Sequence, residues 1–101
     1  MKSTAIAIRE LFDAIDLEDA LEGIRLLAAI DALCLRLDQD LKSKSESLPK
    51  AGYVQEKVEL FRSCCWHALV PQEGTDHKTP DAWMGAAKDS LLKVQFELSG
   101  V

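Results

Sequence analysis

The sequence predicts an all-α fold, an antiparallel helical bundle of three long helices plus a shorter N-terminal helix. Leucine and alanine dominate the 101 residues, and only 6% of the residues are aromatic. No segment of useful length alternates apolar and polar residues as a half-buried strand does. Residues 24–37 (IRLLAAIDALCLRL) have a helical composition and are apolar around most of the helix circumference. Because a surface helix normally has one apolar stripe, this one is expected to be covered on two sides.

The chain is long enough for one domain, residues 1–101, and two helices are expected in its first half. The first is predicted over residues 4–15, with Ser3 as its N-cap. Its inner face comprises Ile8, Leu11, Phe12 and Ile15. The helical spacing of the apolar residues is interrupted near Asp16. This carboxylate is therefore expected to cap a second helix over residues 17–42. One long kinked helix across the break is the alternative.

The predicted second helix carries apolar residues on two faces. One face comprises Leu17, Ala20, Leu21, Ile24, Leu27, Ala28 and Leu35. The other comprises Leu26, Ile30, Leu33, Leu37 and Leu41. Since four short helices offer too little surface to cover both faces, we expect a homodimer with a two-fold interface. The residues expected to meet the second copy are Leu26, Ile30, Leu33 and Leu37, with the first helix as the alternative contact.

The second half of the chain predicts two further helices. Residues 43–49 are polar and serine-rich and are expected to form a connection. The third helix is predicted over residues 50–70, with an inner face of Val54, Val58, Phe61, Cys65 and Leu69. A threonine cap, a proline and an acid (Thr79-Pro80-Asp81) mark the start of the fourth helix, residues 80–98. Its inward positions are Met84, Ala87, Leu91, Val94 and Leu98.

Charge and hydropathy disfavour several classes of partner. The formal net charge is −5, and residues 1–40 carry all of it, with nine acids and four bases. Like charges repel, so neither nucleic acid nor an anionic membrane is expected as a partner. The longest apolar run, residues 26–30, is far shorter than the ~20 residues that span a bilayer. Three cysteines, an odd number, are expected to be reduced, so a cytoplasmic location is predicted.

One cluster of residues has metal-ligating side chains. Cys64 and His67 are three residues apart and share a helical face, which suits two ligands of a tetrahedral zinc ion. Cys34 and His77 could supply the other two ligands. No pair has the Cys-x-x-Cys spacing, and cysteine is among the commonest core residues. We therefore interpret the cysteines as core residues and expect neither metal nor cofactor, with a metal site or a reactive thiol as alternatives.

The run His67-Ala68-Leu69 resembles part of the His-x-Leu-Lys-Gly motif of histidine phosphotransfer domains, which are four-helix bundles of this size. The match covers His67 and Leu69, whereas Val70 stands in place of the lysine and Pro71 in place of the glycine. The resemblance implies a phosphorelay module with His67 as the phosphorylated residue. The missing lysine would remove a positive charge that favours the phosphoryl group.

Asp31 is the one acid among the leucines of residues 24–37. A buried charge must be paired, so a covered Asp31 should face Arg62, Lys88 or an interface donor, and such a contact would fix helix register. A position at the edge of the stripe and a catalytic role are the alternatives. Trp66 and Trp83 are candidate interface residues, because tryptophan is frequent at binding hot spots. They could instead pack on one another and close the end of the bundle.

No acid–base pair, phosphate-binding loop or nucleophile motif points to a reaction. The sequence is therefore interpreted as a small cytoplasmic interaction or regulatory protein, without catalysis, that acts through helical protein–protein contacts. Its expected partners are a second copy of itself and another protein. A phosphorelay module using His67, and a helical bundle that binds a metal or a small ligand, are the alternatives.

Overall fold

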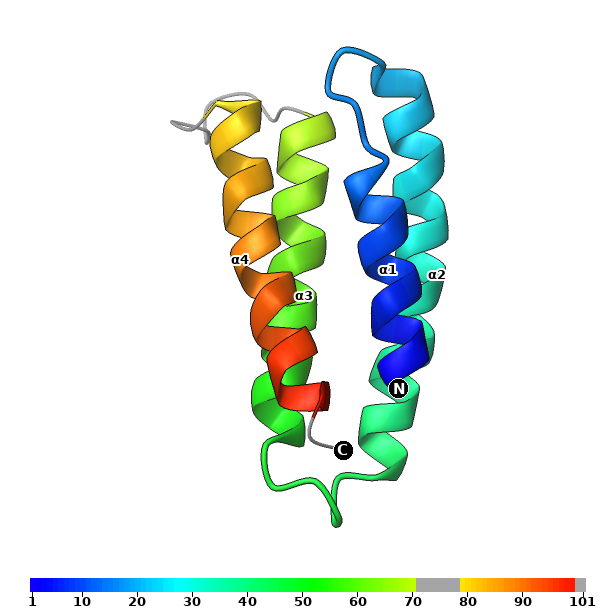
Figure 1. Cartoon of the computed structure of the whole chain (residues 1–101), viewed down its shortest axis with the longest axis vertical. Coiled ribbons are helices and arrows are strands. Elements are labelled where there is room, and N and C mark those ends of the chain that lie inside the picture. The colour runs from blue at the N-terminus through cyan, green and yellow to red at the C-terminus, as the bar shows by residue number, and fades with distance from the viewer. Residues whose placement is uncertain (71–78, 100–101) are drawn as a thin grey trace.

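Four helices make up the part of the chain that the structure, a computed structural model, describes: residues 1–70 and 79–99 (Figure 1). They are α1 (Lys2–Asp13), α2 (Ala20–Ser43), α3 (Ala51–Leu69) and α4 (Pro80–Ser99). No strand occurs in these ranges, which confirms the predicted all-α class. Within the described ranges, no helix has an apolar stretch long enough to cross a bilayer.

The helices run alternately up and down, so that each packs against its neighbours in the sequence (Figure 1). α4 also packs against α1 and closes the bundle, which leaves α2 and α4 on opposite corners. Arg9 Nη1 donates to Gln95 Oε1 at 3.2 Å and ties α1 to α4. Lys50 Nζ lies 3.4 Å from Glu97 Oε1 and ties α3 to α4. The bundle measures 40 × 24 × 18 Å, and α2 extends along most of its long axis.

The largest difference from the predicted helix bounds is at the start of α2. Asp19, not Asp16, is the N-cap, and its side chain accepts a hydrogen bond from the Glu22 N–H at 3.2 Å. Asp16 Oδ1 instead accepts from the Glu18 N–H at 3.0 Å and orders the connection between α1 and α2. The two helices are therefore separate. α1 begins earlier than predicted, after Met1, so Ser3 lies inside the helix and does not cap it.

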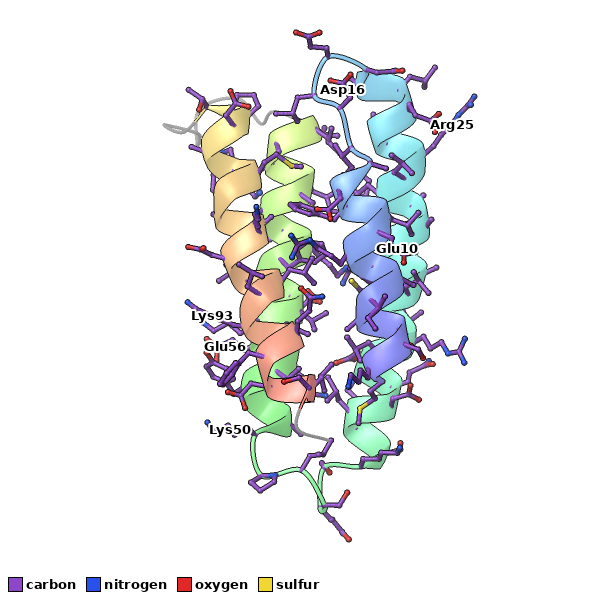
Figure 2. All side chains as sticks on the ribbon, in the orientation of Figure 1. Glu10, Asp16, Arg25, Lys50, Glu56 and Lys93 are labelled. Carbon is purple, nitrogen blue, oxygen red and sulfur yellow. The ribbon has the colours of Figure 1, made fainter. Side chains whose placement is uncertain are left out.

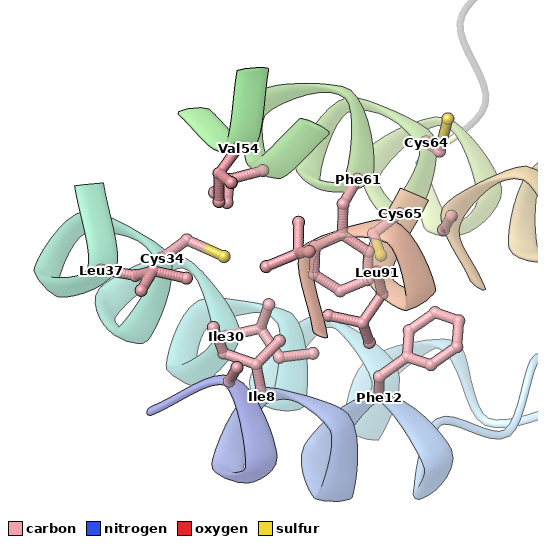
Figure 3. Packing of buried hydrophobic residues seen from close by; sticks show 14 of the residues in the cluster. Ile8, Phe12, Ile30, Cys34, Leu37, Val54, Phe61, Cys64, Cys65 and Leu91 are labelled. Carbon is pink, nitrogen blue, oxygen red and sulfur yellow. The ribbon is translucent and has the colours of Figure 1, made fainter. Parts of the chain in front are cut away.

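The core runs along the interior of all four helices (Figure 3). Its largest fully buried side chains are Ile8, Leu27, Ile30, Leu37, Leu41, Phe61, Leu91, Val94 and Leu98. The rings of Phe12 and Phe61 meet edge to face, with centroids 5.4 Å apart, and join α1 to α3 across the bundle. The predicted inward residues of α3 are all buried, as are those of α4 except the half-buried Met84.

Candidate functional site

Asp31 joins α2 to α3 through two charge-assisted hydrogen bonds. Arg62 Nε donates to Oδ1 at 3.0 Å, and the indole Nε1 of Trp66 donates to Oδ2, also at 3.0 Å. The guanidinium of Arg62 extends further and donates to Glu59 at 2.8 Å. The hydrogen bond to Asp31 is the main cause that raises the pKa of Arg62 above its ordinary value. Arg62 is thus one of the expected donors, whereas the contribution of Trp66 was not predicted.

We expect Asp31→Ala to lower the free energy of unfolding by about 1–2 kcal/mol. Hydrogen bonds to a charged group contribute about 1.5–3 kcal/mol when buried, and partial exposure reduces this value. The side chain of Asp31 is 23% exposed. Urea denaturation measures the loss. Asp38→Ala is the matched control, because Asp38 is also half-buried but pairs only with the exposed Lys42 on the same helix, so its removal should cost less than about 0.5 kcal/mol. Equal losses in the two variants would contradict the structural role of Asp31.

Cys34, Cys64 and Cys65 are all buried. Burial is the main cause that raises the pKa of the Cys34 thiol to about 12, and it likewise raises the pKa of Cys65. A thiol with so high a pKa is protonated at neutral pH and is a poor nucleophile. This agrees with the interpretation of Cys34 and Cys65 as core residues.

The second tryptophan stacks on the histidine of the cysteine-rich segment. The rings of His67 and Trp83 lie 4.5 Å apart, and His67 Nδ1 is 2.7 Å from the Ser63 carbonyl oxygen. Because a carbonyl can only accept, Nδ1 carries the proton in this contact. Trp66 and Trp83 are both half-buried, and the contacts to Asp31 and His67 give each tryptophan a different partner.

Three of the four candidate metal ligands lie among the residues that the structure describes. Cys64 and His67 both lie in α3, Cys34 lies in α2, and His77 lies outside the described residues. Within residues 1–70 and 79–99, no three histidine, cysteine or acidic side chains come together as a metal site requires. The metal and phosphorelay interpretations of His67 stay predictions.

A recess of about 470 Å³ opens at the end of the bundle where α2 is connected to α3. Apolar side chains from both helices and from the end of α4 line it, and the ion pair between Lys50 and Glu97 lies at its edge. A small ligand, one of the alternatives raised by the sequence, would meet here an apolar cavity with one charged group of each sign.

The α2 face predicted to meet a second copy lies inside the chain. Ile30 and Leu37 are fully buried, and Leu26 and Leu33 are half-buried. The prediction that this row forms the dimer interface is therefore wrong for Ile30 and Leu37, because the other helices of the same chain cover them. The other predicted apolar face is open in part: Leu21 is 67% exposed and Leu35 is 60% exposed, whereas Leu27 is fully buried.

A second group of exposed apolar residues spans α3 and α4. We call it the α3–α4 surface, and its members are Tyr53, Leu60, Leu92 and Phe96. Phe96 is 76% exposed, the largest value among the exposed apolar side chains. Tyr53, Leu92 and Phe96 line one shallow groove of about 850 Å³, and Leu60 lies two turns along α3 from Tyr53 on the same face. The predicted inward positions already leave Phe96 out, so the sequence contained the signal for this surface.

Charges of both signs surround the groove of the α3–α4 surface. Asp89 and Lys93 line it, and Lys57 lies with its ammonium 5.3 Å from the centre of the Tyr53 ring. Figure 2 shows Lys93 and Glu56 projecting from this side of the bundle, while Arg25 projects from the α2 side. No family model, curated protein sequence or solved structure matches the chain.

Proposed function

We propose that the protein is a small, non-enzymatic interaction or regulatory protein that binds another protein through the α3–α4 surface. The observation that carries the proposal is the 76% exposure of Phe96 beside exposed Leu92 and Tyr53. Apolar residues gathered on an otherwise charged surface mark interaction sites more often than single exposed residues do. Burial of a fully exposed phenylalanine contributes about 1.5–3 kcal/mol to binding, while its exposure contributes nothing to the fold.

The shape of the surface favours a helical or extended partner segment. The groove lies along α4 and has Tyr53 of α3 on its edge, so it resembles the grooves that accept the apolar side of an amphipathic helix. Acidic and basic groups at its rim can orient such a segment without requiring a strongly charged partner. The proposal places the protein in the cytoplasm, which the odd number of cysteines and the burial of the Cys34 and Cys65 thiols support.

The proposal is tested by photo-crosslinking from position 96 in the native host. A benzophenone amino acid replaces Phe96 in one strain and Glu10, an exposed residue of α1, in the other. A discrete protein should crosslink from position 96 and not from position 10. That protein, once purified, should bind the Phe96→Ser variant at least tenfold more weakly than the wild type, since burial of one large apolar side chain is lost.

The free energy of unfolding of the Phe96→Ser variant should lie within about 0.5 kcal/mol of the wild-type value, because the replaced ring is exposed. A weakened interaction then reports on the surface and not on the fold. Ile6→Ser, which removes an exposed isoleucine from α1, is the matched control and should leave this binding unchanged. The proposal fails if no protein crosslinks from position 96, or if both serine variants bind the captured protein equally well.

A further inference from the structure

The open apolar face of α2 is a row of five residues, which we call the α2 row. Its members are Leu21, Ile24, Ala28, Ala32 and Leu35. The two leucines are 67% and 60% exposed, Ile24 is 36% exposed, and both alanines are exposed. The spacing follows one side of the helix over four turns, about 21 Å. The row is separate from the α3–α4 surface, because α2 and α4 occupy opposite corners of the bundle.

The α2 row is symmetric about its central alanine. Leu21 and Leu35 each lie seven residues from Ala28, on opposite sides of it. Ile24 and Ala32 each lie four residues from it. An antiparallel pair of α2 helices related by a two-fold axis at Ala28 therefore places leucine on leucine at both ends. It also places isoleucine beside alanine between them, and the small central residues allow the helices to approach closely.

The charges beside the α2 row favour the same antiparallel arrangement. Glu22 lies six residues before Ala28 and Arg36 lies eight residues after it, both on the solvent side of the row. An antiparallel pair brings the glutamate of one copy near the arginine of the other at both ends. A parallel pair would instead keep the glutamate and the arginine at opposite ends of the contact, so this attraction would be absent.

A small recess lies where the end of this contact would fall. It has a volume of about 110 Å³, and residues of both α2 and α3 line it: Cys34, Leu35, Asp38, Gln55, Val58, Glu59 and Arg62. In the antiparallel pair, the exposed Leu21 of the second copy is the side chain that arrives beside it.

We propose that the α2 row is a homodimer interface in which two copies of α2 pack antiparallel about a two-fold axis at Ala28. One row of five residues is a small contact beside the roughly 800 Å² per partner of a standard interface, so we expect a weak dimer whose population depends on protein concentration. The proposal does not depend on the α3–α4 surface, which stays exposed in the dimer. It retains the predicted homodimer but assigns it to the face of α2 opposite to the predicted one.

Sedimentation equilibrium from 5 to 300 µM tests the interface with a charge exchange. The Leu21→Glu and Leu35→Lys variants should each weaken dimerisation at least tenfold, because each places two charges in the apolar contact. In the double variant, the dissociation constant of the dimer should return to within about threefold of the wild-type value. In the antiparallel dimer the new carboxylate of one copy meets the new ammonium of the other, whereas a parallel dimer would keep like charges together. Leu92→Glu, a change of an exposed leucine on α4, is the control and should leave the dimer intact.

Each other outcome overturns the proposal. A wild type that stays monomeric at 300 µM excludes the dimer, and a dimer that both single variants leave unchanged excludes the α2 row. Loss of the dimer in Leu92→Glu would assign it to the α3–α4 surface. Failure of the double variant to recover, with its helical content and unfolding midpoint unchanged, would exclude the antiparallel arrangement.

Discussion

Replacing Phe61 by alanine is expected to lower the free energy of unfolding by about 3–5 kcal/mol, as truncation of a buried phenylalanine typically does. Phe61 is 1% exposed and meets the Phe12 ring across the centre of the bundle. The variant therefore loses the transfer free energy of the ring, gains a cavity and loses an aromatic pair. Domains of this size are stable by about 5–15 kcal/mol, so this change removes a large part of the total.

Urea denaturation followed by circular dichroism measures the loss. Leu60→Ala is the matched control, because Leu60 directly precedes Phe61 on the same helix but is 46% exposed. Its truncation should cost less than about 1 kcal/mol. Comparable losses of stability at positions 60 and 61 would contradict the structure, because they would mean that a different side of α3 faces the core.

Much of the fold could be predicted because local signals agree with the tertiary structure. The fourth helix begins at Pro80 as expected, and Thr79 Oγ1 accepts a hydrogen bond from the Ala82 N–H at 3.2 Å. The α2 start was misplaced because Asp16 and Asp19 are both suitable caps and the pattern alone does not rank them. In the structure the helix begins after Asp19, and Gly23 in its first turn lies so close to α3 that a Cβ there would be 2.8 Å from the Leu69 side chain.

The candidate surfaces were harder to predict, because exposure depends on contacts between distant segments. The sequence showed two apolar faces on α2, but only the arrangement of the other helices determines which face is covered. The Trp66 hydrogen bond to Asp31 joins residues 35 positions apart, and no local pattern reports it. Phe96 is different. It lies two residues from both Val94 and Leu98, so helical periodicity already places it on the outer side.

The two proposed surfaces together would make the dimer bivalent. α2 and α4 lie on opposite corners of the bundle, so pairing through α2 leaves an α3–α4 surface exposed on each copy. A partner that is itself dimeric, or that repeats its binding segment, would then engage both copies and bind more tightly than a single segment does. The Leu21→Glu variant would lose this gain and keep the affinity for a single segment.

Raising the pH from 8 to 10 is expected to lower the free energy of unfolding by about 3 kcal/mol through Cys34 and Cys65 alone. Burial raises the pKa of Cys34 from its ordinary value of 9.0 to about 12 and raises the pKa of Cys65 as well. Below pH 9 both thiols keep their protons in the folded and the unfolded chain. Between pH 9 and 12 the unfolded chain releases protons that the folded chain retains, so stability falls by about 1.4 kcal/mol per thiol and pH unit.

Urea denaturation at pH 8, 9 and 10 in the presence of a phosphine reductant measures this decrease. The double variant Cys34→Ala, Cys65→Ala is the control, since every group other than these two thiols is present in both proteins and contributes equally. The double variant should be less stable at pH 8, because truncation leaves small cavities, but its stability should decrease less between pH 8 and 10. The difference between the two decreases is the contribution of the thiols. If the wild type and the double variant lose the same stability, the two sulfurs are accessible to water in the folded protein, and the packing of α2 against α3 around Cys34 and Cys65 is looser than the structure shows.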